Sequence, residues 1–150
     1  MVRVEVSGGL PVPPSEAFNY VTDMAQWPSF FPGFVRVLNP ETARWSNPGD
    51  CVTVISHLFG RENHLHMQLE EFTAGERVRF VLRQRALPVA HHERHFIERA
   101  EGCECRFITT YASRPGLTGF LDRSVVKRGI RRALRHAMRR IQSHFATHAV

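Results

Sequence analysis

The longest regular pattern of apolar and polar residues in this chain runs from Thr118 to Phe145. Apolar side chains recur there every three or four residues, which is the period of one face of an α-helix. They are Val126, Ile130, Ala133, Leu134, Ala137, Met138, Ile141 and Phe145. Arginines occupy most of the opposite face, and no proline interrupts the segment. The pattern predicts one helix about 40 Å long, at ~1.5 Å per residue, whose apolar stripe must pack against a surface of similar length.

Before this helix, the pattern changes to the alternation of apolar and polar residues that is typical of β-strands. Val2, Val4 and Val6 predict a first strand that ends at Gly8 and Gly9. Six further strands are predicted at residues 35–38 and within 51–59, 64–72, 77–85, 90–99 and 103–113. Short polar turns at 47–50, 60–63 and 74–76 join several of them. Strands joined in this way form an antiparallel meander.

Two short helices are predicted between the first and second strands. The first follows a proline-rich entrance. The second can extend for only a turn or two, because Pro28 and Pro32 bound it. Four aromatic residues crowd this second segment: Trp27, Phe30, Phe31 and Phe34. A short aromatic element of this kind favours a lid at the mouth of a pocket.

The predicted elements can be assembled in one way. Arginines share one face of the strand at 77–85, so the sheet has a polar face. Its other face must be covered, and only the C-terminal helix is long enough. A curved sheet around one helix cannot close tightly everywhere, so we expect a cavity between them, with the aromatic helices at its mouth. No linker divides the chain, and residues 1–150 are expected to form a single α+β domain.

Composition and charge narrow the classes of function. No apolar run approaches the ~20 residues of a membrane span, and no signal peptide is recognisable, which predicts a cytoplasmic location. The net charge of +6 would suit nucleic acid or an anionic membrane. Of the 20 basic residues only Lys127 is a lysine, and this arginine bias runs through the whole chain. We therefore interpret the basic helix face as solvated, expect no nucleic-acid partner and do not favour a membrane contact.

Histidines and glutamates are the candidates for chemistry. One strand face carries His64, His66, Gln68 and Glu70, and another carries His91, Glu93 and His95. A set that faced an apolar cavity could act in general acid–base catalysis. Apolar residues compete for the interior on the first strand, and parity is ambiguous on the second, where both Phe96 and Ile97 are apolar. Solvated or structural histidines are the favoured alternative, and the catalytic residues stay unknown.

The sequence offers little support for a metal or a cofactor. His64 and His66 could supply two metal ligands, but no third ligand lies at a diagnostic spacing. There is no phosphate-binding glycine loop and no nucleophile elbow. We expect neither metal nor cofactor. The three cysteines do not form a disulfide framework, and we interpret Cys51, Cys103 and Cys105 as small buried apolar residues.

The order of these elements resembles the START-like superfamily, also called Bet v 1-like or SRPBCC, and its polyketide cyclase/dehydrase family. The resemblance covers nearly the whole chain. Its most telling stretch is residues 12–34, where Asp23, Trp27-Pro28 and Phe31-Pro32 fit the family pattern, and the glycine turn at Gly102 fits as well. The resemblance implies a helix-grip fold: a seven-stranded antiparallel sheet wrapped around a long C-terminal helix, with two short helices after the first strand.

The resemblance also implies a cavity for a hydrophobic or aromatic small molecule, such as a lipid, a polyketide or a quinone-like compound. Strand parity, the helix stripe and the lid select the ligand-binding candidates. These are Trp27, Phe31, Phe34, Leu65, Met67, Leu69, Phe80, Leu82, Phe107, Tyr111, Val126, Ile130 and Leu134. The alternative for any one of them is that it only packs the core.

Two further functions stay open beside that of a carrier. Polyketide cyclases of the family use polar cavity residues, including an arginine on a middle strand. Strand order places that arginine near residues 69–71, where this chain has Glu70 and Glu71, so we carry the role over to no residue. A cyclase/dehydrase-type enzyme is one alternative. The other is a lipid or quinone carrier that docks on a membrane through the basic helix face. The chain could act as a monomer or a homodimer.

Overall fold

The computed structural model of the chain describes residues 1–58 and 61–148, apart from the side chains at positions 34, 35, 58 and 148. The strands are β1 (Val2–Leu10), β2 (Phe34–Val37), β3 (Cys51–Leu58), β4 (Arg61–Thr73), β5 (Arg77–Arg83), β6 (Ala90–Arg99) and β7 (Gly102–Tyr111). The helical elements are α1 (Pro14–Thr22), η1 (Met24–Gln26), α2 (Trp27–Phe30), α3 (Gly116–Leu121), η2 (Asp122–Val126) and α4 (Lys127–His148).

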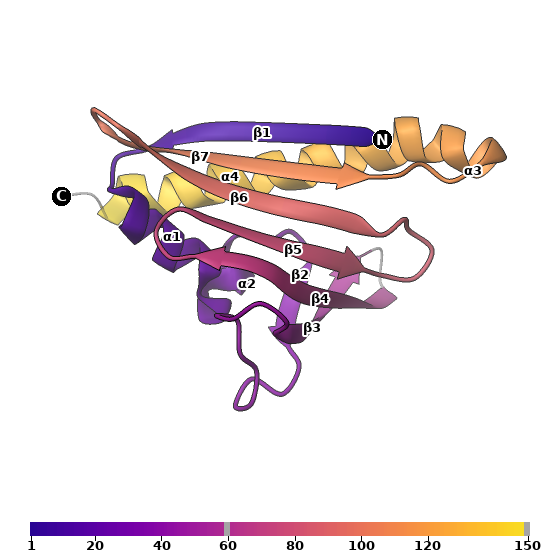
Figure 1. The fold of residues 1–150 in the computed structure, drawn as a ribbon, viewed down its shortest axis with the longest axis horizontal. Helices are drawn as coiled ribbons and strands as arrows, with labels where there is room; N and C mark the ends of the chain where they lie inside the picture. The colour runs from indigo at the N-terminus through magenta and orange to yellow at the C-terminus, as the bar shows by residue number, and fades with distance from the viewer. Residues whose placement is uncertain (59–60, 149–150) are drawn as a thin grey trace.

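Within the described ranges, seven strands form one antiparallel sheet in the order β1-β7-β6-β5-β4-β3-β2. Figure 1 shows α4 running along the length of this sheet, with α1 and α2 near one end of it. Apolar side chains of α1, α2 and α4 meet those of the inner sheet face in one core, which includes Phe18, Leu69, Phe107 and Ile141. The predicted helix-grip architecture is confirmed.

The C-terminal helix is longer than the predicted span of 118–145. Helical geometry begins at Gly116 and continues through η2, a π-helical segment, into α4. A π-helical turn is usually a local insertion into an α-helix. Here it contains Asp122, whose buried carboxylate accepts hydrogen bonds from the backbone N–H and the guanidinium of Arg114. The start of the helix is thereby attached to the segment that follows β7.

The first strand does not end at its glycines. Gly8 pairs with Cys105 and Gly9 with Glu104, so β1 continues to Leu10. A Cβ at Gly8 would lie 2.7 Å from Nε2 of Gln142, because α4 crosses close to the strand there. The glycine that we interpreted as a strand terminator therefore allows close packing of helix on strand. Of the predicted turn at 60–63, residue 60 lies outside the described residues, and residues 61–63 already belong to β4.

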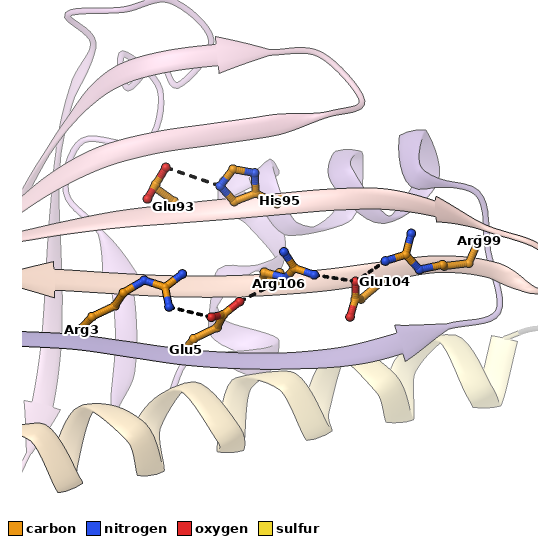
Figure 2. Close-up of polar contacts among 7 residues, drawn as sticks. All are labelled: Arg3, Glu5, Glu93, His95, Arg99, Glu104 and Arg106. Atoms are coloured by element: carbon orange, nitrogen blue, oxygen red, sulfur yellow. Dashed lines mark hydrogen bonds and ion pairs between the residues drawn. The ribbon is translucent and has the colours of Figure 1, made fainter.

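The outer face of the sheet is polar, as predicted. Figure 2 shows ion pairs that join β1, β7 and β6. Glu5 pairs with Arg3 and Arg106, and Glu104 pairs with Arg106 and Arg99. Exposed pairs of this kind contribute about 0–1 kcal/mol each. Because successive side chains of a strand point to opposite faces, the apolar residues of the same strands are directed towards the helices. No helix in the described ranges is long and apolar enough to cross a membrane.

Candidate ligand-binding cavity

A cavity of about 190 Å³ lies between the sheet and the long helix. Strands β3 to β7, α2 and α4 all contribute to its wall, because their inward-facing residues do not meet at this level. The wall is mainly apolar. Its apolar residues include Val54, Leu65, Met67, Phe80, Leu82, Leu87, Ala90, Val126, Ile130, Ala133 and Leu134. The polar residues among those that line it are Ser56, Gln84, His92, Arg94 and Tyr111.

Most of the predicted ligand-binding positions lie in this wall. They are Trp27, Phe31, Leu65, Met67, Phe80, Leu82, Tyr111, Val126, Ile130 and Leu134. Leu69 and Phe107 are also directed inward, but they are fully buried in the core and are not part of the wall. The side chain of Phe34 lies outside the described residues. Strand parity thus identified the face of each residue, whereas the depth along each strand decided which of them reach the cavity.

Trp27 is not positioned as the expected lid. Trp27 is only 2% exposed, and its indole N–H donates to the backbone carbonyl of Val21 at 2.9 Å. Its ring packs edge-on against Trp45, so it is a core residue and not a lid. The wall is most exposed at the β5–β6 connection, where Leu87 is 39% exposed. We therefore place the mouth between this connection and the part of the helix around Val126.

Arg94 is a buried cation in the cavity wall. Its side chain extends from β6, and the residue is 3% exposed. Its guanidinium carbon lies 4.1 Å from the ring centroid of Phe107 and 5.3 Å from that of Phe80. No carboxylate of the described residues forms an ion pair with it. Burial lowers the pKa of Arg94 to about 10, so the guanidinium remains charged at neutral pH.

His92 lies two residues before Arg94 on the same strand face. Its Nδ1 is 3.0 Å from the hydroxyl of Thr109 on β7, and its ring stacks on Phe80. Nε2 is buried and has no hydrogen-bond partner among the described residues. Burial holds the pKa of His92 well below 6.5, and the nearby charge of Arg94 lowers it further. The imidazole is therefore neutral at pH 7, with one nitrogen oriented by Thr109 and the other free to bind a ligand.

Ser56 supplies a second unpaired polar group. Ser56 lines the cavity, and its buried hydroxyl has no partner in the described part of the chain. It lies on β3, three strand spacings from β6. At ~4.8 Å per spacing, the two strands are about 14 Å apart along the sheet. One small polar group could not contact both His92 and Ser56, so the cavity has two separate polar points.

The polar sets identified from the sequence lie on the outer face. His91 pairs with Glu70, and His95 pairs with Glu93. His66 is hydrogen-bonded to Thr53 at an exposed position. The polar residues of β6 that line the cavity are instead their neighbours, His92 and Arg94. Phe96 could have indicated that His92 and Arg94 face inward, because it lies on the same face of β6 and is buried in the core.

Tyr111 closes the end of the cavity near η2. Its hydroxyl donates to the backbone carbonyl of Asp122. The hydrogen bond from the Arg114 side chain holds the pKa of the Asp122 carboxyl below its usual range. These contacts tie the end of β7 to the start of the helix, and they position Val126 over the cavity.

The cysteines divide into two groups. Cys103 and Cys105 are buried, and burial raises the pKa of the Cys105 thiol, which makes it a poor nucleophile. Cys51 is exposed, so the expectation that it is buried was wrong. Within residues 1–58 and 61–148, no group of three His, Cys, Asp or Glu side chains could hold a metal ion.

Solved structures share this architecture. Protein TTHA0849 from Thermus thermophilus has a TM-score of 0.78 and 14% identity, over 99% of this chain and 100% of that one. Ara h 8.0201 has a TM-score of 0.75 and 12% identity, over 97% and 98%. The di-domain ARO/CYC StfQ from the steffimycin biosynthetic pathway has a TM-score of 0.75 and 16% identity, over 99% of this chain and 51% of that one. At such identities the likeness shows the fold alone.

Comparison at the level of sequence gives the family. A search of curated proteins finds no match. A family model described as "Polyketide cyclase / dehydrase and lipid transport" matches residues 1–146. Since this match covers almost the whole sequence, the chain belongs to the polyketide cyclase/dehydrase and lipid transport family.

Proposed function

We propose that this protein binds a mainly apolar small molecule that carries an acidic or carbonyl oxygen, and that this oxygen contacts Arg94 and His92. The observation that carries the proposal is the buried guanidinium of Arg94, which has no carboxylate partner among the described residues. Arg94 lines the same cavity as His92, whose Nε2 has no hydrogen-bond partner in the described ranges. A guanidinium and an imidazole nitrogen together suit a carboxylate, an enolate or a polarised carbonyl. The apolar wall would hold the rest of the molecule.

The energetics of Arg94 favour this interpretation. Burying an unpaired ion costs several kcal/mol after relaxation. Contacts of Arg94 with the rings of Phe80 and Phe107 offset only part of this cost, since a desolvated cation–π contact contributes about 2 kcal/mol. An aliphatic side chain would fill the same space at lower cost. An oxygen-bearing ligand would supply the missing acceptor and would explain why a cation occupies this position.

The cavity volume limits the size of the ligand. An apolar cavity of ~150 Å³ is enough to bind benzene, whereas pockets for drug-sized ligands measure about 300–1,000 Å³. The volume of about 190 Å³ therefore suits one or two fused rings. A long lipid or a full polyketide would require the mouth near Leu87 to widen.

The proposal is tested with two probes of similar size, 2-naphthoate and 2-methylnaphthalene, by titration calorimetry. We expect the protein to prefer the acid. Arg94→Met should reduce this preference at least about tenfold, equivalent to ~1.4 kcal/mol, and should retain binding of the hydrocarbon. Arg79→Met, on the exposed outer face, is the matched control and should bind like the wild type. Equal preference in wild type and Arg94→Met would contradict the role of Arg94. Failure to bind either probe would contradict the cavity as a site for ring compounds of this size.

A second candidate function is that of a cyclase/dehydrase-type enzyme. It is favoured by the presence of two titratable side chains, His92 and Arg94, in the same part of the cavity wall. A neutral imidazole could accept a proton from the carbon between two carbonyls, and the guanidinium could stabilise the enolate oxygen that forms. The shared chemistry with the first proposal is the binding of an anionic oxygen at Arg94.

Turnover of a linear poly-β-ketone thioester separates the enzyme from the carrier. If the protein is such an enzyme, His92→Gln should lower the rate by roughly 10²–10⁴-fold, the usual contribution of general acid–base catalysis. It should retain the part of the naphthoate binding that Arg94 provides. His66→Gln, which alters the outer face, should leave the rate unchanged. Naphthoate binding without any turnover would favour the carrier. Native mass spectrometry of freshly purified protein would then identify a retained ligand.

A further inference from the structure

One face of α3 and η2 exposes large apolar side chains. Leu117 is 77% exposed, Phe120 59%, Leu121 45% and Val125 63%. Their spacings of three and four residues place them on one side of the helix. The other side of the same turns is directed into the protein, where Gly119 and Asp122 are buried. This apolar face is separate from the stripe of α4 that packs on the sheet.

Two more exposed apolar residues lie at the same end of the molecule. Leu87 is 39% exposed and Val89 is 46% exposed, both in the β5–β6 connection. A guanidinium nitrogen of Arg114 donates to the carbonyl of Ala86 at 3.0 Å, which links this connection to the segment that leads into α3. Figure 1 shows α3 and the β5–β6 connection at the same end, on the right of the view. We call these six residues the apolar tip: Leu87, Val89, Leu117, Phe120, Leu121 and Val125.

The apolar tip adjoins the mouth of the cavity. Leu87 belongs both to the tip and to the cavity wall. Val126, which follows Val125 directly, also lines the cavity. A surface that covered the tip would therefore lie against the mouth, and an apolar ligand could pass between that surface and the cavity without crossing water.

The C-terminal segment that begins at the tip is strongly positive. Residues 113–150 contain nine of the 20 arginines and lysines and only one of the 14 acidic residues. This segment therefore has a net charge of +8, whereas the rest of the chain has a net charge of −2, which gives the total of +6. The single acid, Asp122, is already paired with Arg114. Arg123, Lys127 and Arg128 follow the exposed apolar turns immediately. An apolar helix face bordered by cations is the pattern of segments that bind at the surface of anionic membranes.

We propose that the apolar tip inserts into the surface of an anionic phospholipid membrane, with the mouth of the cavity turned towards the bilayer. A second copy of the chain fits less well, because two such ends would bring like charges together. Figure 1 also shows that α3, which carries part of the tip, protrudes beyond the ends of the strands. Acyl chains accommodate a protrusion without a complementary shape. This docking differs from contact along the whole basic face of α4, which would lay the helix flat on the membrane.

Vesicle flotation tests the membrane contact. We expect binding to vesicles of phosphatidylcholine with about 30% phosphatidylglycerol, weak binding to phosphatidylcholine alone, and loss of binding at ~1 M salt, where charges are screened beyond ~3 Å. The double substitution Leu117→Ser with Phe120→Ser keeps the charge and should lower binding at least about tenfold. Both side chains are exposed, so the fold should be retained, which circular dichroism would verify.

Two charge variants supply the matched control. Lys127→Ser with Arg128→Ser removes two cations beside the tip, and Arg139→Ser with Arg140→Ser removes two from the distant part of α4. The first pair should weaken binding several-fold more than the second. Equal effects would indicate general attraction and would overturn the proposed orientation. Wild-type binding by the Leu117→Ser and Phe120→Ser variant, or no binding by the wild type, would overturn the proposal itself. A concentration-dependent dimer that this variant loses would assign the tip to a second copy.

Fluorescence quenching by brominated lipids reports the orientation. The two native tryptophans, Trp27 and Trp45, are buried at 2% and 7% exposure, so their background should be low. Phe120→Trp places a fluorophore in the tip, and Ala146→Trp places one at an exposed position near the end of α4. We expect strong quenching for Phe120→Trp and only background quenching for Ala146→Trp. Equal quenching of both would show that the helix lies flat, which would overturn docking by the tip.

Discussion

Arg94 on β6 lies directly over the ring of Phe107 on β7, with its guanidinium carbon 4.1 Å from the ring centroid. The two residues are opposite each other in the register of these strands. The aromatic ring thus takes the place that a carboxylate would take in a buried ion pair. One guanidinium nitrogen of Arg94 donates to the backbone carbonyl of Glu93 at 3.5 Å, and no carboxylate of the described residues pairs with the cation. This arrangement leads to the first prediction.

Replacement of Arg94 by methionine should not destabilise the protein. Methionine fills a similar volume and removes the unpaired charge, and exchanges of this kind at buried ionic groups are neutral or stabilise by about 1–4 kcal/mol. Urea unfolding of wild type, Arg94→Met and the outer-face control Arg79→Met measures the change. A clear loss of stability specific to Arg94→Met would show that the cation–π contacts outweigh the cost of burial.

Stability should fall as the pH drops below 6.5 because of His92. Its pKa lies well below 6.5 in the folded state. Between pH 6.5, the pKa in the unfolded chain, and the lower folded-state pKa, the unfolded chain binds a proton that the folded chain excludes. Stability therefore decreases with decreasing pH, by at most ~1.4 kcal/mol per pH unit. His92→Gln lacks this group and should show a shallower decline between about pH 7 and about pH 5. Parallel declines of variant and wild type would contradict a neutral, buried imidazole.

The Asp122 carboxylate should stabilise the start of the long helix at neutral pH. Its folded-state pKa lies below 3.8, mainly through the hydrogen bond from the Arg114 side chain. The stabilisation is therefore present above pH 3.8 and is lost as the pH falls through the lower folded-state value. Asp122→Asn should lower Tm at pH 7 and speed hydrogen exchange at η2, and the difference from wild type should shrink in acid. Glu101→Gln, at an exposed turn, should match the wild type throughout.

Gly8 should tolerate a side chain less well than Gly9, although both lie in β1. A Cβ at Gly8 would approach Nε2 of Gln142 to 2.7 Å and Sδ of Met138 to 3.0 Å, whereas a Cβ at Gly9 would meet nothing within 4 Å. Gly8→Val should destabilise by about 1–3 kcal/mol through overpacking against α4. Gly9→Val should be neutral or stabilising, because valine favours strands. Equal thermal stability of the two variants would contradict the close contact of β1 with α4.

Local patterns were enough to predict the architecture. The alternation of Val2, Val4 and Val6 and the helical period from Val126 to Phe145 reflect which side of each element is buried, and burial follows from side-chain chemistry. The inward faces of β4 and β5 were predicted for the same reason. The cavity walls at Leu65, Met67, Phe80 and Leu82 follow from those faces.

Local patterns could not decide which face of β6 is turned inward. Phe96 lies on one face of β6 and Ile97 on the other, so hydrophobicity alone does not show which face is buried. The register with β7 decided it, because Arg94 pairs with Phe107 and His92 pairs with Thr109. Hydrogen bonding of His92 to Thr109 and stacking of Arg94 on aromatic rings make it feasible to bury these two polar residues.

The C-terminal helix, where the sequence pattern is clearest, shows the same difference between what the sequence predicts and what the tertiary structure decides. Its period by itself determined that a long helix exists and which stripe packs on the sheet. Only the tertiary structure decided that its first turns, with Leu117 and Phe120, extend past the sheet and keep their apolar face uncovered. The physical reason is that periodicity records the chemistry of a face, whereas exposure depends on whether another part of the chain reaches that face.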